Sequence, residues 1–334
     1  MDYPILRTVV DIPQAKEKIS YSSKVMFIGS CFTEEIGEKF ESYLFDTDIN
    51  PFGVIYNPVS VANSLKILIQ KRLFTEKDLE QRGSQWFSFY HHSRFSFESK
   101  EETLNTINER IEKSSEFLKK ADFLFITLGT AWVYVLNRTG EVVSNCHKLP
   151  AKIFTRKMLE TEEIVDLYSN LLQDLWSFNP KLKIYFTVSP VRHWKDGAYG
   201  NRVSKSVLFV ALDKLMKRFD SVGYFPAYEI VMDELRDYRF YAKDMIHIGE
   251  QGVDYIWFRF KEKFFDEAML DTLKEVEKVT KAIEHRPKSR FSEEYKLFVE
   301  KTLEKIMILK KNNPHIKIQR IEDHFINELK TLEK

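Results

Sequence analysis

Cysteine is scarce in this sequence, and long apolar runs are missing from it. Only 2 cysteines occur among 334 residues, Cys31 and Cys146. They are too few for a disulfide framework, and they lack the paired spacing of a zinc site. No window approaches the ~18 uninterrupted apolar residues of a membrane span, and residues 1–18 lack the basic and apolar regions of a secretory signal. We therefore expect a soluble, cytoplasmic protein that does not act at a membrane.

An excess of charge of either sign is also absent. Lys and Arg number 51 against 50 Asp and Glu, so the net charge is +1. Nucleic-acid binding would call for a basic face or stripe, and we expect no nucleic-acid partner. The sequence has no phosphate-binding P-loop, and no two histidines have a metal-ligand spacing such as H-E-x-x-H. The sequence therefore predicts a protein without a metal or another cofactor.

The pattern of apolar residues predicts a largely parallel β-sheet with helices on both faces. Short apolar runs at 24–29, 121–128 and 182–188 each end in a loop that carries Gly, Ser or Pro, which is typical of buried strands. Helical patterns alternate with them at 33–43, 58–70, 101–119, 155–177 and 203–219. This alternation is the pattern of an α/β protein, whose binding sites form at the carboxyl ends of the strands.

Two segments depart from this alternation. Residues 86–97 alternate in the manner of a strand or hairpin, which could cover the site as a flap. From residue 261 onward the chain is rich in Lys and Glu, with helical patterns at 265–284 and 292–312 and then a polar tail. We predict a catalytic domain over 1–260 and an α-helical extension over 261–334. The extension would pack on the domain or on a second copy of the chain, giving a homo-oligomer.

A candidate nucleophile follows the first strand, in the sequence "GSCF". Gly29 would relieve a tight turn, and Ser30 would either cap the following helix or act as a nucleophile facing the N–H groups of the new helix. Cys31 is a rival nucleophile, because a thiolate at a helix N-terminus can have a lowered pKa. Only one of two successive side chains can face the site, and the other would pack beneath it.

A candidate base lies in "DMIHIGEQG". Asp244 precedes His247 by three residues, so its carboxylate could hold Nδ1 and leave Nε2 to accept a hydroxyl proton. The alternative is a loop Asp and a loop His that merely cap the next helix. The order Ser, Asp, His is used by hydrolases built on α/β sheets, but the G-x-S-x-G motif of the ordinary α/β-hydrolases is missing.

Five motifs in one order resemble the GSCFA-domain family, a branch of the SGNH/GDSL hydrolase superfamily. They are "GSCF", "NPFGVIYNP", "TLGTAWVY", "NCHKLP" and "DMIH", and the resemblance covers roughly residues 1–260. It implies a three-layer α/β/α flavodoxin-like fold. It also implies Ser30 as nucleophile, with Cys31 packed beneath it, His247 as base and Asp244 as the acid that orients the base.

The resemblance implies an oxyanion hole that is incomplete in this chain. The superfamily's second block supplies a glycine N–H, which corresponds to Gly53. Its third block supplies an asparagine side chain, but this sequence has Gly-Thr-Ala-Trp at 129–132. We predict that Thr130 or Asn145 replaces that asparagine as a donor, beside the N–H groups of Ser30 and Gly53.

Further polar and aromatic residues are candidates for substrate binding. His147, Arg192 and His193 could bind an anionic or polyhydroxylated substrate, as could His92, Arg94 and Lys148, and each could equally be a surface residue. Trp132, Tyr134 and Trp194 could stack on a sugar ring, although aromatic residues in an α/β core mostly serve packing.

Taken together, the sequence predicts a serine esterase that acts on small O-acyl groups, with O-acetyl esters on carbohydrate as the expected substrates. If a sugar hydroxyl outcompetes water for the acyl-enzyme, the same site is an O-acyltransferase. A third hypothesis is a carbohydrate- or ligand-binding protein with an inactive site, because the third-block asparagine is missing.

Overall fold

The chain divides into two units in a computed structural model that describes residues 8–287 and 289–332. Unit 1 consists of the described residues up to Ile12, Val25–Gly37 and Asp48–Ile256; unit 2 consists of Pro13–Lys24, Glu38–Thr47 and the described residues from Trp257 onward. The expected boundary after residue 260 falls within the last turns of helix α7 (Glu250–Phe264).

A five-stranded sheet forms the centre of unit 1, in the order β10-β9-β5-β1-β2. The strands are β1 (Lys24–Gly29), β2 (Asp46–Ile49), β5 (Phe123–Leu128), β9 (Lys183–Val188) and β10 (Val222–Tyr224). β5 pairs in parallel with both β1 and β9, and β9 pairs in parallel with β10. Numbered in chain order within this sheet, the strands run 2-1-3-4-5, which is the flavodoxin-like order. The predicted strands at 24–29, 121–128 and 182–188 are confirmed.

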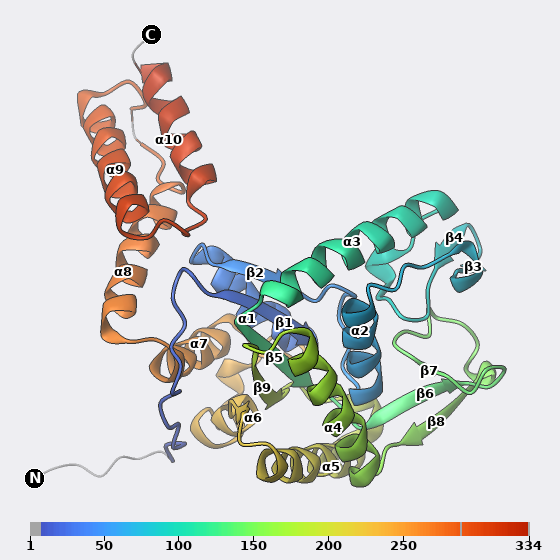
Figure 1. Ribbon diagram of the computed structural model, residues 1–334. Coiled ribbons are helices and arrows are strands. Elements are labelled where there is room, and N and C mark those ends of the chain that lie inside the picture. Colours follow the sequence, from blue (N-terminus) through green and yellow to red (C-terminus); the bar gives the residue numbers. More distant parts are fainter. Residues whose placement is uncertain (1–7, 288, 333–334) are drawn as a thin grey trace, which may run out of the picture. The chain divides into compact units, whose positions relative to one another are not determined.

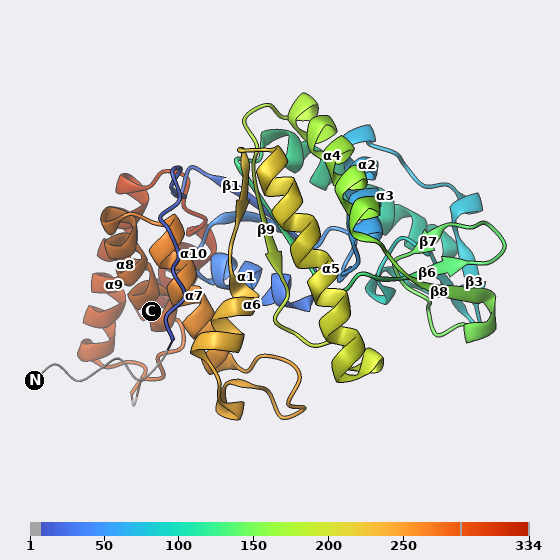
Figure 2. The same cartoon turned by 90° about the horizontal axis from the view of Figure 1, so that it is seen from below.

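Helices cover both faces of this sheet, as the sequence predicted. In Figure 2, α2 (Pro58–Gln70), α4 (Thr161–Phe178) and α5 (Gly197–Arg218) lie on one side, and the first turns of α1 (Cys31–Ser42) with α6 (Ala227–Glu229) lie on the other. α4 packs against both α2 and α5, and α2 also packs against α3 (Lys100–Lys120). The fold is therefore a three-layer α/β/α sandwich with a flavodoxin-like sheet.

One predicted helix begins later than expected. The helical pattern at 155–177 corresponds to α4, but residues 154–158 form the strand β8 (Phe154–Met158). β8 pairs antiparallel with β6 (Trp132–Leu136), which also pairs with β7 (Val142–Val143). The segment is a strand because β6 offers it a partner, and that partner is distant in sequence.

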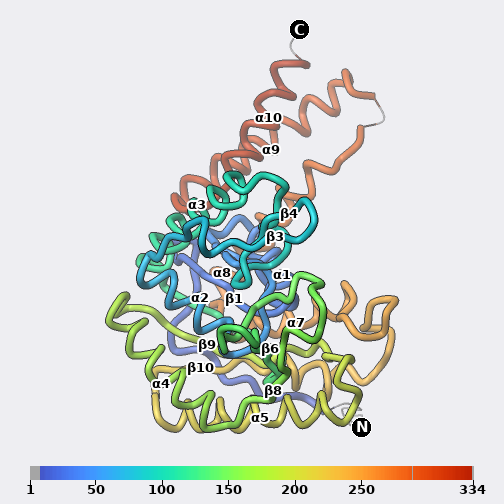
Figure 3. Tube along the Cα trace, turned by 90° about the vertical axis from the view of Figure 1, so that its right-hand side faces the viewer, coloured from blue at the N-terminus to red at the C-terminus, as the bar shows by residue number. Residues whose placement is uncertain are grey.

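The segment expected to be a hairpin lies between α2 and α3. Residues 80–82 (β3) pair antiparallel with 85–87 (β4), followed by a short 3-10 helix at 93–95. The hairpin therefore lies earlier than the expected 86–97, whose two ends meet only in an isolated antiparallel bridge between Trp86 and Phe97. This hairpin and the β6–β8 sheet lie on the same side of unit 1, the right-hand side of Figure 1 and the side facing the viewer in Figure 3. They are joined where the Ser144 N–H donates to the Phe89 carbonyl at 2.8 Å.

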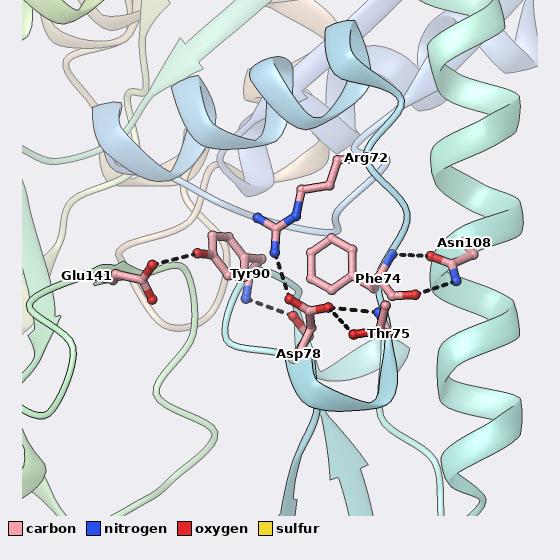
Figure 4. A network of polar contacts seen from close by, with 8 residues as sticks. Arg72, Phe74, Thr75, Asp78, Tyr90, Asn108 and Glu141 are labelled. Carbon is pink, nitrogen blue, oxygen red and sulfur yellow. Dashed lines mark hydrogen bonds and ion pairs between the residues drawn. The ribbon is translucent and has the colours of Figure 1, made fainter.

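A polar network holds the start of this insertion in place (Figure 4). Arg72, just after α2, forms an ion pair with Asp78 at 2.7 Å, and the other carboxylate oxygen of Asp78 accepts the Thr75 N–H. Asn108 of α3 bonds both backbone groups of Phe74, accepting its N–H at 2.7 Å and donating to its carbonyl at 3.0 Å. The insertion is thus tied to both flanking helices.

Unit 2 has an aromatic core and three further helices, α8 (Glu267–Ala282), α9 (Glu293–Asn312) and α10 (Gln319–Leu332). In the core, Phe40 packs on Trp257 and Phe260, and Phe45 stacks on Phe265 at 5.6 Å. The polar segment expected after residue 312 forms a further helix, α10, which buries its apolar side chains Ile321 and Phe325. Within the described residues, no helix combines the length and apolarity needed to cross a membrane.

Candidate active site

Ser30 lies in the turn between β1 and α1, at the carboxyl end of the sheet. Its N–H donates to the Thr127 carbonyl of β5 at 3.2 Å, so the turn lies between the adjacent strands β1 and β5, where the strand order reverses. This is the switch point of a flavodoxin-like sheet, where ligands bind. Gly29 has φ 144°, and a Cβ there would lie 2.2 Å from the Thr127 oxygen, so only glycine fits.

The Ser30 side chain is buried and its hydroxyl is unused. Only 4% of the residue is exposed, and its Oγ has no hydrogen-bond partner among the residues that the structure describes. It therefore accepts no N–H from α1, and the capping interpretation loses its support. A Cβ on Gly129 would lie 3.7 Å from Ser30 Cβ and 2.8 Å from Tyr56 Cβ, so Gly129 keeps open the space beside the hydroxyl.

Cys31 is less suited to attack than Ser30. Burial is the main cause that raises the pKa of the Cys31 thiol, so the thiolate is disfavoured despite the helix N-terminus. Cys31 is half-buried and Ser30 is the more buried of the two, the reverse of the expected order.

Asp244 and His247 form the hydrogen bond expected from their spacing. Nδ1 of His247 lies 2.6 Å from Oδ2 of Asp244, while Oδ1 accepts the backbone N–H groups of Ile246 and His247, both at 3.0 Å. The hydrogen bond with His247 is the first cause that lowers the pKa of Asp244, to about 2. The carboxylate thus fixes both the loop and the imidazole, with Nδ1–H as the donor.

The loop that carries this pair is closed by its backbone. The Ala242 N–H donates to the His247 carbonyl at 2.8 Å, and Tyr241 bridges Ile248 as in an antiparallel ladder. Met245 at the tip has φ 58°, a left-handed conformation. At Gly252 a Cβ would lie 2.5 Å from the Ile248 side chain, so the helix that follows approaches the loop closely.

Ser30 and His247 both belong to unit 1, but they are not hydrogen-bonded to each other in this structure. Such bonds are often long before substrate binds, so the pairing of the two side chains stays a prediction. Burial is the main cause that raises the pKa of Tyr241, and the positive charge of Arg192 opposes this shift.

The two predicted backbone donors of the oxyanion hole already have acceptors. Gly53 N–H donates to the Asn50 carbonyl at 2.8 Å, and Ser30 N–H donates to Thr127. Gly53 has φ 76°, and a Cβ there would lie 2.3 Å from His92 Cβ, which explains the glycine without reference to catalysis. A hole built on these two groups stays a prediction, and each would have to share its hydrogen between two acceptors.

The two predicted replacements for the missing asparagine have contacts of their own. Thr130 is 1% exposed; its hydroxyl lies 2.8 Å from the Ser204 hydroxyl and accepts the Trp132 N–H. Asn145 lies against Phe89, and its Oδ1 accepts the His147 N–H at 2.8 Å. Neither contact supports a role as oxyanion donor.

The predicted substrate-binding residues differ in their surroundings. His147 is 7% exposed, stacks on Phe87 at 4.1 Å and bonds the Ser88 carbonyl through Nε2, and burial is the main cause that lowers its pKa to about 4. Its contacts indicate packing. His193 lies near Tyr56, with ring centroids 5.3 Å apart, and Arg192 acts on Tyr241. These two remain candidates for binding.

Sequence reasoning missed a charged and aromatic cluster next to Tyr56. Arg156 forms an ion pair with Asp196 and lies over the Trp132 ring at 4.3 Å. The ring of His193 lies 5.3 Å from that of Tyr56, and the His193 carbonyl accepts the Asp196 N–H at 3.1 Å, so the cluster adjoins Tyr56 beside the Ser30 site. No sequence pattern joins these residues, because they come from three separate segments. In the described part of the chain, no group of three His, Cys, Asp or Glu side chains could hold a metal ion.

Fold and site together define a flavodoxin-like α/β protein with a serine at the switch point and an Asp–His pair on a loop of the same unit. Comparison with family models shows that the chain belongs to the GSCFA family, whose model matches residues 24–260. The model of the GSCFA domain protein C-terminal domain matches residues 276–331. No curated protein sequence matches this chain.

Solved structures offer only distant likenesses. A carbohydrate esterase family 3 protein from Talaromyces cellulolyticus is 12% identical, with coverage of 75% of this chain and 98% of that chain and a TM-score of 0.33. The acetyl xylan esterase Est2A from Butyrivibrio proteoclasticus is also 12% identical, with coverage of 72% of this chain and 63% of that chain and a TM-score of 0.36.

Proposed function

We propose that this protein is a serine esterase for small O-acyl esters, with Ser30 as nucleophile, His247 as general base and Asp244 as the acid that orients His247. Ser30 Oγ attacks the ester carbonyl carbon while His247 Nε2 takes the hydroxyl proton. The intermediate collapses, the alcohol leaves with the proton from His247, and the acyl group stays on Ser30. Water then repeats the sequence and releases the acid.

The observation that carries this proposal is the hydrogen bond of 2.6 Å between His247 and Asp244. It fixes the imidazole so that Nε2 is the ring nitrogen without a proton, which is the state a general base needs. Ser30, buried at the switch point and with a hydroxyl that has no partner in the described part of the chain, would supply the matching nucleophile. We infer a small acyl group because so little of Ser30 is exposed.

A carbohydrate is the alcohol that the neighbouring residues would suit. Trp132 and Tyr134 offer aromatic rings beside the Arg156–Asp196 pair, and this cluster adjoins Tyr56 next to Ser30. Sugar hydroxyls can accept hydrogen bonds from a cation and donate them to an anion. The face of the sugar ring can stack on an aromatic side chain at the same time. The substrates we propose are therefore O-acetyl esters of carbohydrates.

The test compares wild type and Ser30→Ala on short-chain aryl acetates and on acetylated sugars. Wild type should hydrolyse both and react with a fluorophosphonate probe at Ser30, and Ser30→Ala should do neither. Cys31→Ala is the matched control and should retain most activity. Loss of activity in a folded Cys31→Ala, together with an active Ser30→Ala, would show that the serine mechanism is wrong.

Acyl transfer to a sugar is the second candidate, and the cluster of Trp132, Arg156 and Asp196 favours it. A sugar bound by that cluster would bring its hydroxyl to the acyl group on Ser30 in competition with water. Product analysis with an added sugar acceptor separates the two reactions, because a transferase yields acylated sugar in place of free acid. If wild type shows neither reaction and no labelling, the non-catalytic binding hypothesis takes their place.

A further inference from the structure

We propose that the side-chain amide of Asn50 is the donor that replaces the missing third-block asparagine in the oxyanion hole. The proposal rests on the esterase function, because the oxyanion belongs to an ester attacked by Ser30. It makes Asn50 a catalytic residue, since its Nδ2 would touch the reacting oxygen.

The backbone places Asn50 directly beside the nucleophile turn. It follows β2, the strand next to β1, and its N–H donates to the Phe27 carbonyl of β1 at 2.9 Å. Its side-chain Oδ1 accepts the N–H of Gly29, the residue before Ser30, at 2.8 Å. The Asn50 side chain therefore reaches the very turn that holds the nucleophile.

This hydrogen bond also fixes which way the amide points. A backbone N–H can only donate, so the side-chain atom that meets Gly29 must be the oxygen. The NH₂ group then faces away from Gly29. Asn50 is 0% exposed, and its Nδ2 has no partner within the described part of the chain.

An unpaired buried amide is rare and calls for an explanation. Here two polar atoms without a partner among the described residues, Asn50 Nδ2 and Ser30 Oγ, belong to side chains that adjoin the same Gly29 turn. One is a donor and the other a nucleophile. An ester suits both, because its carbonyl carbon meets the hydroxyl while its carbonyl oxygen accepts the N–H.

A second buried asparagine in the same loop shows what a purely structural one looks like. Asn57 is 3% exposed and caps α2: its Oδ1 accepts the Ser60 N–H at 2.8 Å and its Nδ2 donates to the Ser60 hydroxyl at 2.9 Å. Both ends of that amide are used. The amide of Asn50 uses its oxygen in the same way, but its donor end has no partner among the described residues.

The test uses Asn50→Asp, which keeps an oxygen for Gly29 N–H and replaces the donor by an acceptor. Aspartate also tolerates the left-handed backbone at this position, where φ is 43°. Removal of an oxyanion donor lowers kcat by roughly 10²–10³-fold with little change in KM. We expect at least that loss of kcat on aryl acetates, and a comparable loss of affinity for an alkylboronic acid, which forms a tetrahedral adduct on the serine.

Asn57→Asp is the matched control and should change kcat by no more than a few fold. Asn50→Gly, which also tolerates a positive φ, carries the test if Asn50→Asp does not fold. If wild type is active and labelled at Ser30 but the folded Asn50 variants keep kcat and boronic-acid affinity, this inference is wrong and the esterase function stands. If wild type is neither active nor labelled, the esterase function fails and this inference fails with it.

Discussion

The carboxylate of Asp244 makes three hydrogen bonds, and they have different consequences. Two go to backbone N–H groups and shape the loop, and the third orients the imidazole of His247. An amide at this position would still accept the backbone N–H groups through its oxygen. Its NH₂ group would donate to Nδ1, and the ring proton would move to Nε2.

Asp244→Asn should therefore fold normally and lose most activity. Where a catalytic acid has been replaced in this way, kcat falls roughly 10⁴-fold because the imidazole adopts the wrong tautomer. Steady-state kinetics on an aryl acetate measure the loss. Asp237→Asn is the control, since Asp237 also accepts a backbone N–H, that of Arg239, on the same exposed stretch. A similar kcat for the two variants would contradict the assigned role of Asp244.

Lys205 is an ionisable residue whose burial should govern stability. It is 2% exposed and donates to the Ser189 carbonyl at 2.5 Å, and burial is the main cause that lowers its pKa to about 7. Between about pH 7 and the unfolded value near 10.5, the unfolded chain carries the proton and the folded chain does not. The contribution of Lys205 to the free energy of unfolding therefore rises with pH across this range.

Lys205→Met should stabilise the protein more at low pH than at high pH. Below about pH 7 the wild type keeps a charge in the interior, and the variant removes that cost. Urea unfolding at about pH 6 and about pH 9 gives the free energy of unfolding of variant and wild type. We expect the advantage of the variant to be smaller by about 1–3 kcal/mol at the higher pH. If variant and wild type differ in unfolding free energy by the same amount at both pH values, the charge of Lys205 does not govern stability and only its hydrogen bond does.

At the scale of single elements, α5 joins two strand-end loops through one buried polar face. Asn201, Ser204 and Lys205 lie three and four residues apart, so they share a side of the helix. Asn201 accepts the His193 N–H, Ser204 accepts the Ala131 N–H, and Lys205 donates to Ser189. The helix thereby fixes the loops that follow β5 and β9.

Ser204→Ala should weaken this connection measurably. It leaves the buried Ala131 N–H without an acceptor and removes the partner of the Thr130 hydroxyl, a cost of about 1–3 kcal/mol. Chemical denaturation gives the loss, and a double-mutant cycle with Thr130→Val should show coupling of about 0.5–3 kcal/mol. Additive effects would indicate that the two hydroxyls do not act together.

At the scale of the whole molecule, unit 2 combines early and late segments of the chain. Phe40 and Phe45 come from the first fifty residues, and Trp257, Phe260 and Phe265 complete their core. A chain cut after residue 256 therefore leaves large aromatic side chains without their partners.

Two truncations test this arrangement. Residues 1–256 should be insoluble or aggregate, because Phe40 and Phe45 lose the rings that cover them. Residues 1–266 keep Trp257, Phe260 and Phe265, and should be the more soluble and better folded of the two in size-exclusion chromatography and circular dichroism. Equal behaviour of the two fragments would show that these aromatic contacts do not hold unit 2 together.

The sequence by itself determined the elements whose signals are local. Apolar runs that end in turn residues predicted β1, β5 and β9, and periodicity predicted α2 and α3 almost to the residue. The hydrogen bond of Asp244 with His247 also followed from spacing, because three residues on one turn bring a carboxylate and an imidazole within reach.

Only the tertiary structure decided the features that depend on distant partners. β8 is a strand because β6 pairs with it, and α10 is a helix whose apolar side chains are buried although its composition is polar. The side-chain amide of Asn50, at the end of the neighbouring strand, accepts the Gly29 N–H, and no sequence motif indicates this contact. Hydrogen-bond satisfaction and burial are properties of the packed chain, so a sequence read along its length does not contain them.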